Sequence, residues 1–283
     1  MFSGKKEPMK QLTCLTTILC ACVALSAFAG PEPLPSGKEM KQVAPAPMPE
    51  CDSTWTGFYV GANFGYGWGN ADTDFDPLPD AATFFDLVPQ SLDPDPDGFI
   101  GGGQIGFNWQ LGRHFVIGVE SDFQGTDMEG DESRGPIVDI TGAVVNADSF
   151  LAAHERMQWF GSTRGRLGFS PACRWLIYAT GGVAYGDVDF SANTNYGTPG
   201  TLFATYPTSF SETELGWTAG GGIEFAIGHH WTVKAEYLYY DLGNESSTIN
   251  QRIAGVPQGP PFFVHYDFEN SGNIVRGGLN FKF

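Results

Sequence analysis

Long apolar runs are missing from this sequence. No window carries 18 consecutive apolar residues, which excludes a membrane-spanning helix of ordinary length. Basic residues are scarce as well: 15 Lys and Arg stand against 32 Asp and Glu, giving a net charge of −17. Such a chain repels phosphate and is excluded as a nucleic-acid binder. Charged residues amount to only 17%, below the roughly 25% of ordinary soluble domains.

Cysteine is also rare, and most of it falls in an export signal. Residues 1–29 carry Lys5, Lys6 and Lys10, then an apolar stretch, and end in Ala27-Phe28-Ala29. A basic start, a short apolar region and a small-x-small site predict a secretory signal peptide. Met9 is an alternative start. A lipoprotein site with Cys22 as the acylated residue is the alternative processing.

Only two of the five cysteines, Cys51 and Cys173, lie beyond the signal. Cysteines in an oxidising compartment are candidates for pairing, although a barrel width between these two would prevent it. The segment 30–54 is rich in proline and has no apolar period, as in Ala44-Pro45-Ala46-Pro47. We expect it to be an extended periplasmic linker.

What the chain has in abundance is glycine (38) and phenylalanine (23), arranged from Trp55 onward with a period of two. Segments of about ten alternating residues separated by turns are typical of membrane barrels. The expected strands are Trp55–Trp68, Phe99–Leu111, Phe115–Gln124, Glu155–Ser170, Trp175–Phe190, Glu212–Ile227, Trp231–Leu242 and Ile274–Phe283.

The connections alternate in length. Short turns follow the second, fourth and sixth strands, and His114, His229 and His230 lie in them. Long polar stretches, including the acidic 72–97, follow the odd-numbered strands, and Ile137 to Asn146 could extend two strands as a hairpin. The pattern predicts an all-β, eight-stranded antiparallel transmembrane up-and-down β-barrel over 55–283, with short periplasmic turns and acidic external loops.

Charges within the strands all fall on the face opposite the large aromatic residues. A charge facing lipid costs about 2–4 kcal/mol at the midplane, so this segregation favours a barrel with charges inside. The alternative, a soluble barrel, would bury too many rings in a lumen that only just holds side chains. The predicted lumen ion-pair network is Glu120, Asp122, Arg164, Arg166, Glu224, Lys234, Glu236 and Arg276.

Tryptophan completes the membrane pattern. Six tryptophans lie near strand ends or in outward rows, where they would form aromatic girdles at the two interfaces. They are Trp68, Trp109, Trp159, Trp175, Trp217 and Trp231.

Two groups of polar residues offer a chemistry as the alternative to a solvated surface. Asp93, Asp95 and Asp97, with Gln104 at the twelfth position, partly fit a calcium loop but lack its final Glu and flanking helices. Ser149, His154 and Glu155 form a nominal catalytic set without a motif. We therefore expect no enzyme and no cofactor, with Ca²⁺ in the first external loop as the alternative.

Several motifs resemble one family. Trp55-Thr56-Gly57-Phe58-Tyr59-Val60-Gly61, Arg164-Gly165-Arg166-Leu167-Gly168 and Trp231-Thr232-Val233-Lys234-Ala235-Glu236-Tyr237 resemble strands of the OmpA-like outer-membrane proteins of alphaproteobacteria, a porin-type family. The resemblance implies an eight-stranded barrel in the Gram-negative outer membrane. It also implies that the terminal Phe283 is read by the barrel assembly machinery. The long first and second loops depart from the family pattern.

The function we expect is a structural, surface-exposed barrel that supports envelope integrity. The expected partners are outer-membrane lipid and lipopolysaccharide, with no nucleic acid. The alternatives are a passive porin-like pore for small solutes and an adhesin that binds a host or matrix ligand through its loops.

Overall fold

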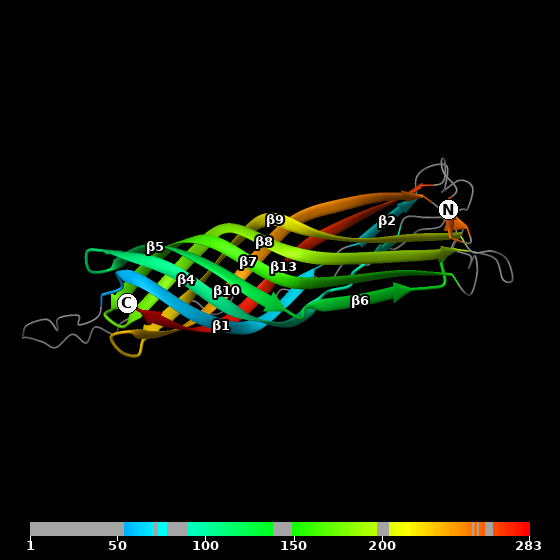
Figure 1. Ribbon diagram of the computed structural model, residues 1–283. Coiled ribbons are helices and arrows are strands. Elements are labelled where there is room, and N and C mark those ends of the chain that lie inside the picture. Colours follow the sequence, from blue (N-terminus) through cyan, green and yellow to red (C-terminus); the bar gives the residue numbers. More distant parts are fainter. Residues whose placement is uncertain are drawn as a thin grey trace, which may run out of the picture. The chain divides into compact units, whose positions relative to one another are not determined.

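The computed structural model describes residues 54–70, 73–77, 90–137, 149–196, 204–250, 252–253, 255–257 and 263–283 (Figure 1). The predicted signal peptide, almost the whole linker, Cys51 and nearly all of the hairpin predicted at 137–146 lie outside these residues. Within them, the model contains no helix that is long and apolar enough to span a bilayer.

Eight long antiparallel strands form a closed ring. They are β1 (Gly57–Asn70), β4 (Asp97–Leu111), β5 (Phe115–Thr126), β7 (Phe150–Ala172), β8 (Trp175–Tyr196), β9 (Ala204–Ala226), β10 (Trp231–Asn250) and β13 (Phe263–Lys282). Each strand pairs with the next in chain order, and β1 pairs with β13 from Tyr59 opposite Lys282 to Asn70 opposite Ser271. The predicted eight-stranded up-and-down barrel is therefore confirmed.

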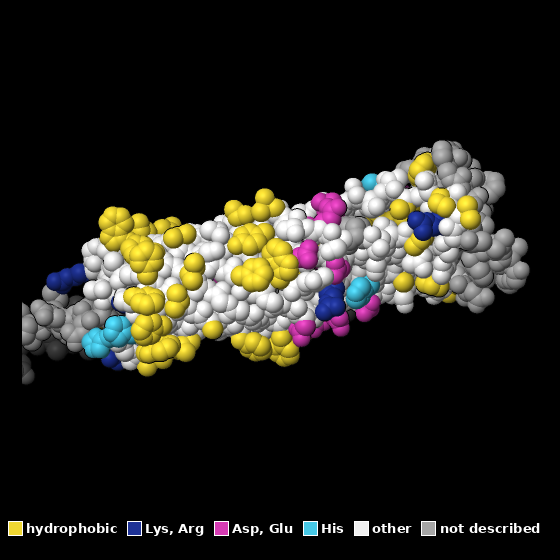
Figure 2. Space-filling view, in the orientation of Figure 1, with side chains coloured by type: hydrophobic (Ala, Val, Ile, Leu, Met, Phe, Trp, Pro, Cys, Tyr) yellow, Lys and Arg dark blue, Asp and Glu magenta, His cyan; other side chains and the backbone are white. Residues whose placement is uncertain are grey.

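Along the short-turn half of the barrel, the period of two separates an apolar outward face from a polar inward face, as predicted. Outward side chains there are large and apolar, and they form two belts separated by small residues (Figure 2). We call this half the spanning segments; they comprise residues 58–68, 99–111, 115–125, 159–169, 175–185, 215–227, 231–241 and 273–283. Inward side chains at the same levels are mostly polar or charged.

Strands continue well beyond the spanning segments, whereas the sequence predicted such an extension only at Ile137 to Asn146. The strand β7 begins at Phe150 and β9 at Ala204, while β13 begins at Phe263, eleven residues before its expected start at Ile274. Short strands add to the same end: β2 (Thr73–Pro77), β3 (Gln90–Leu92), β6 (Glu129–Arg134), β11 (Arg252–Ile253) and β12 (Val256–Pro257). We call this long-loop end the extension.

The extension has the opposite polarity to the spanning segments. Along β13, Val264, Tyr266 and Phe268 are buried inside, whereas His265 and Glu269 lie on the outward face. The same inward face carries Arg276 lower down, where Val275 is exposed outside. Both faces of β13 therefore exchange polarity near Ile274 without a break in the alternation of β13 itself, while its partner β10 has a bulge between Asp241 and Gly243.

A β-bulge in β7 corrects one expected orientation. The sequence period places Gln158 in the lumen, yet its side chain is exposed and its amide donates to Asp189 at 2.6 Å. The pairing of β7 with β8 skips from Met157 to Trp159, so β7 holds one extra residue there. The bulge lets Met157 and Phe160 both point inward.

Candidate functional site in the barrel lumen

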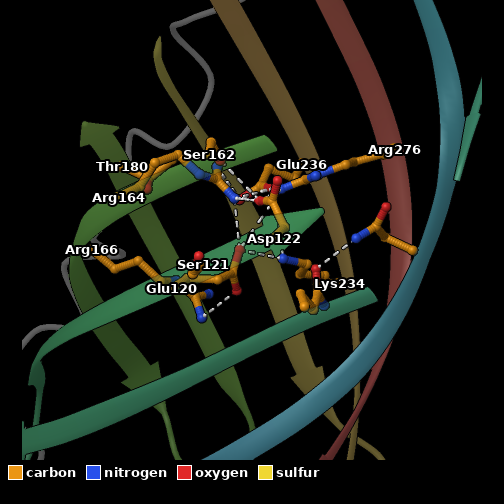
Figure 3. Close-up of polar contacts among 12 residues, drawn as sticks. Glu120, Ser121, Asp122, Ser162, Arg164, Arg166, Thr180, Lys234, Glu236 and Arg276 are labelled. Carbon is orange, nitrogen blue, oxygen red and sulfur yellow. Dashed lines mark hydrogen bonds and ion pairs between the residues drawn. The ribbon is translucent and has the colours of Figure 1, made fainter. Parts of the chain in front are cut away.

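The spanning part of the lumen holds a group of buried charges. The members come from five strands: Glu120 and Asp122 from β5, Arg164 and Arg166 from β7, Glu224 from β9, Lys234 and Glu236 from β10, and Arg276 from β13. The structure thus brings together all eight residues of the predicted network. Figure 3 labels Glu120, Asp122, Arg164, Arg166, Lys234, Glu236 and Arg276, which converge inside the barrel.

Arg164 is the centre of the upper part of this network. Its guanidinium lies 2.7 Å from Glu120 Oε1, 2.7 Å from Asp122 Oδ2 and 3.2 Å from Glu236 Oε1. Arg276 contacts two of the same carboxylates, at 2.8 Å to Asp122 and 2.6 Å to Glu236. Two arginines from different strands therefore share one set of acids and tie β5, β7, β10 and β13 together across the lumen.

Lys234 and Arg166 extend the network toward the short-turn end. Lys234 Nζ donates to Glu120 Oε1 at 2.8 Å, and Arg166 donates to Glu224 at 2.8 Å. Asn280 and Thr232 donate to the other oxygen of Glu224. Four cations thus face four carboxylates, and the network is electrically balanced.

Two tyrosines complete the network and were not among the predicted members. Tyr59 donates to Glu120 at 2.7 Å and accepts from Arg166 at 2.7 Å. Tyr178 donates to Glu236 at 3.0 Å, and the Arg166 guanidinium lies 3.9 Å from its ring centroid. Their position on an otherwise polar strand face was the available signal. Gly222 leaves room for the Tyr178 ring, because a Cβ there would lie 2.7 Å from the hydroxyl.

Apolar side chains cover the charges on both sides. At the short-turn end a small cluster of Trp55, Val116, Leu176, Tyr178 and Ala226 fills the lumen, with Trp55 Nε1 donating to Ser170 Oγ at 3.2 Å. Toward the extension a larger core takes over, including Phe160, Leu238, Tyr240 and Ile274. The lumen is therefore a packed interior in three layers, as expected for a barrel of eight strands.

Two carboxyl groups lie inside the extension, above the spanning segments. Glu155 is buried, and this burial, with the nearby Glu214 as the second cause, raises the pKa of Glu155 to about 8. Burial likewise raises the pKa of Glu214 to about 7, although Asn270 donates a hydrogen bond to it at 3.1 Å. Among the described residues no basic side chain lowers the pKa of either acid, unlike the acids of the network, which are paired with Arg or Lys.

The six predicted girdle tryptophans all lie on the outward face. Trp109, Trp175 and Trp231 belong to the belt next to the short turns, and Trp68, Trp159 and Trp217 to the belt next to the extension. Several stack on neighbouring rings: Trp159 lies 5.3 Å from Phe123, and Trp175 lies 4.7 Å from Phe225. Each belt therefore contains three outward indole rings, as expected of interfacial anchors.

The predicted calcium loop is not arranged as a metal site. Asp93, Asp95 and Asp97 are exposed and alternate with buried Leu92, Pro94 and Pro96, and Asp95 has a left-handed φ of 37°. Gln104 faces the lumen and donates to Asn280 at 2.5 Å. Among the described residues no cluster of three or more His, Cys, Asp or Glu is placed to hold a metal.

The three residues of the nominal catalytic set make contacts in different places. His154 contacts the exposed Asp131 at 2.7 Å, whereas the adjacent Glu155 is buried on the opposite face and Ser149 binds the Ile137 amide. These three residues therefore do not form a catalytic set. Cys173 is disulfide-bonded in its short turn, and its pairing with Cys51 stays a prediction because Cys51 lies outside the described residues.

Comparison with known proteins agrees with this architecture. Residues 18–257 match the family model described as the outer membrane protein beta-barrel domain. The chain belongs to this family. The resemblance noted in the sequence is therefore confirmed, and the family barrel resides in the outer membrane of Gram-negative bacteria.

Curated relatives of this family barrel come from alphaproteobacteria. The 31 kDa outer-membrane immunogenic protein of Brucella melitensis is 35% identical over 246 residues, covering 85% of this chain and 88% of the relative. The 22 kDa outer membrane protein of Rhizobium leguminosarum is 30% identical, covering 81% and 79%. Among solved structures, OprG of Pseudomonas aeruginosa is 9% identical with a TM-score of 0.41, covering 82% of this chain and 98% of that one.

Proposed function

We propose that this protein is a structural, surface-exposed outer-membrane barrel that supports envelope integrity and does not conduct solutes. The observation that carries the proposal is the lumen, where four cations and four carboxylates are paired on the axis and apolar layers lie on either side. A barrel cross-linked in this way is stiff. Its outward apolar belts anchor it in lipid, and its extension stands outside the membrane.

Planar-bilayer recording tests this proposal against a passive pore. We expect the purified barrel to give no steady currents, because an ion would have to displace Arg164 and Arg276 from their carboxylates. A matched variant, Arg164→Ala with Glu236→Ala, removes one charge of each sign and should raise the frequency of openings. Steady open currents from the wild-type protein would overturn the structural function in favour of a porin.

Two partners follow from the same proposal. Lipopolysaccharide and outer-membrane lipid would contact the outward belts. The barrel assembly machinery would read Phe283, whose ring is 71% exposed at the end of β13 and lies edge-on to Phe281 at 5.4 Å. Deleting Phe283 should slow assembly in cells, measured as the fraction of heat-modifiable barrel, whereas Phe283→Trp should not.

A hollow on the outside of the extension favours a second candidate function, adhesion. It lies across β6, β7 and β8 and is lined by Asp131, Glu132, Ser133, His154, Ser191 and Asn193. This hollow would take a polar host or matrix ligand. Two separate variants test the adhesin: Ser191→Trp, whose indole would fill the hollow, and a deletion of residues 78–89. Loss of matrix binding supports adhesion, and unchanged binding in both variants rules it out.

A further inference from the structure

Basic residues gather at the short-turn end of the barrel. Every junction there carries at least one: Arg113 and His114 between β4 and β5, Arg174 between β7 and β8, His229 and His230 between β9 and β10, and Lys282 where β13 ends beside β1. No Asp or Glu side chain among the described residues lies in these turns. Figure 2 shows this rim in dark blue and cyan, just past the first apolar belt.

The opposite interface is acidic. Outward carboxylates gather past the second belt, where Figure 2 shows them in magenta. They are Asp97, Glu129, Asp131, Asp187, Asp189, Glu212 and Glu269. The two water interfaces of the barrel therefore carry charges of opposite sign, and the basic one is the periplasmic rim.

Two of the periplasmic turns share one detailed geometry. The backbone carbonyl of His114 accepts a hydrogen bond from the Ser170 amide at 2.7 Å, and the ring Nδ1 of His114 lies 2.9 Å from the Ser170 carbonyl oxygen. His230 makes the same two contacts with the backbone of Lys282, at 2.7 and 2.9 Å. Because a carbonyl only accepts, Nδ1 carries the proton that fixes each ring, and Nε2 of the neutral ring is left as an acceptor.

Each of these rings is also fixed against the apolar belt. The His114 ring lies 5.6 Å from Phe169 and the His230 ring 5.6 Å from Phe281. Phe169 is an outward residue that faces lipid. The imidazoles therefore sit at the level where acyl chains give way to headgroups, with the exposed Arg113 and His229 immediately before them in the chain.

We propose that the periplasmic rim binds the phosphates of anionic phospholipids in the inner leaflet. Guanidinium groups match phosphate oxygens with paired hydrogen bonds, and the fixed imidazoles hold the turns that present them at this level. The Lys282 ammonium is partly committed, since it donates to the Thr54 carbonyl. Arg113 and Arg174, both exposed, are therefore the principal contacts. This inference goes beyond the proposed structural function and does not depend on it.

Lipid selectivity tests the proposal directly. The full chain is folded into phosphatidylcholine vesicles that contain a trace of spin-labelled phosphatidylglycerol or spin-labelled phosphatidylcholine, and the motionally restricted fraction of each label is measured. We expect the wild-type barrel to prefer phosphatidylglycerol by about two- to threefold, a preference that high salt weakens. Arg113→Gln with Arg174→Gln should lose it.

Matched variants separate charge and place from general damage. Arg113→Lys with Arg174→Lys should keep most of the preference, and Arg134→Gln with Arg156→Gln, at the extension, should leave it unchanged. No preference in the wild type, or an equal one in the double glutamine variant, overturns the proposal. If that variant instead loses cosedimentation with purified cell wall while its lipid preference is unchanged, the rim is a cell-wall interface and the lipid proposal is wrong. None of these outcomes bears on conductance.

Discussion

The spanning segments and the extension are built from the same eight strands but solve opposite solvation problems. In the spanning segments rings face outward, and the eight charges pair inside. In the extension Val188, Phe190 and Tyr266 are buried inside, while Asp187, Asp189 and Asp267 lie outside. Lipid bathes the first and water the second, so each face takes the polarity of what touches it.

The comparison teaches that a continuous strand can pass from one solvent to the other without a break in its own inward–outward alternation. Along β8 the inward positions run Tyr178, Thr180, Ala184 and Val188 in one unbroken alternation. Within β8 only the identity of the residues changes, because hydrogen bonding between strands does not depend on which face is apolar. The change of register lies in its partner β7, between Met157 and Trp159. The lumen of the spanning part therefore requires paired charges, whereas the interior of the extension requires ordinary packing.

The largest expected effect comes from breaking the paired charges. Arg164→Met leaves Glu120, Asp122 and Glu236 short of a cation and should lower the free energy of unfolding by about 3–5 kcal/mol. Arg156→Met, an exposed arginine on the same strand, should change it by about 0.5 kcal/mol or less. Urea titration in vesicles, followed by loss of the heat-modifiable gel band, measures both. Equal effects would mean that the network contributes little.

The second-largest effect is expected from a charge placed on the outward face, because it should lower stability in the spanning segments and not in the extension. Val119 is 51% exposed in the middle of a spanning segment, and Val119→Arg should cost about 2–4 kcal/mol of unfolding free energy because the guanidinium enters lipid. Asp267→Arg, on the outward face of the extension, meets water and should be nearly neutral. The same titration compares them, and a neutral Val119→Arg would place that face in water.

Raising the pH should weaken the extension before the spanning segments. Glu155 and Glu214 have pKa values raised to about 8 and about 7, so their folded forms hold protons that the unfolded chain releases. Their stabilising contribution is complete at acid pH and is lost as pH rises through those values. We expect Tm to fall between acid and alkaline pH, by about 2–4 °C for each kcal/mol of stability lost in a domain of this size.

The variant Glu155→Gln isolates this effect. Glutamine does not ionise, so the melting temperature of the variant should depend less on pH than that of the wild type. Glu129→Gln, which removes an exposed carboxylate from β6 at the same end, should leave the wild-type dependence in place. A Glu155→Gln profile that overlays the wild-type profile would refute the assignment.

The smallest effect is expected from deleting Gln158. Its removal restores plain alternation across the bulge, with Met157 and Phe160 still facing inward, and should cost about 1 kcal/mol for the lost hydrogen bond to Asp189. Deleting Ser121 instead inverts one side of β5 and should prevent folding. The yield of heat-modifiable barrel ranks the two deletions.

The sequence predicted the spanning part well because its outward residues are large. Rows such as Phe115, Ile117 and Val119 stand out against Glu120 and Asp122, and so the strands and the charged lumen could be read directly. The sequence did not predict that the tyrosines belong to the network. An inward position alone does not show that the Tyr59 hydroxyl donates to Glu120.

The extension was read as loop because its residues are polar on average. Yet His265-Tyr266-Asp267-Phe268-Glu269 alternates as strictly as any spanning segment, with the polarity of the two faces reversed. A search for alternation of either sign would have found it. The bulge at Gln158 had no such signal, because an extra residue is recognised only against the partner strand.

The ion pairs in the lumen also constrain how the barrel assembles. Arg276 and Asp122 are 154 residues apart in the chain, and they meet only when the last strand has joined the first. A chain inserted hairpin by hairpin would expose Glu120 and Asp122 to hydrocarbon for as long as their cations were missing. The circle of strands must therefore close in one concerted event, and a catalyst that holds it open in a polar environment until then would remove the main kinetic barrier.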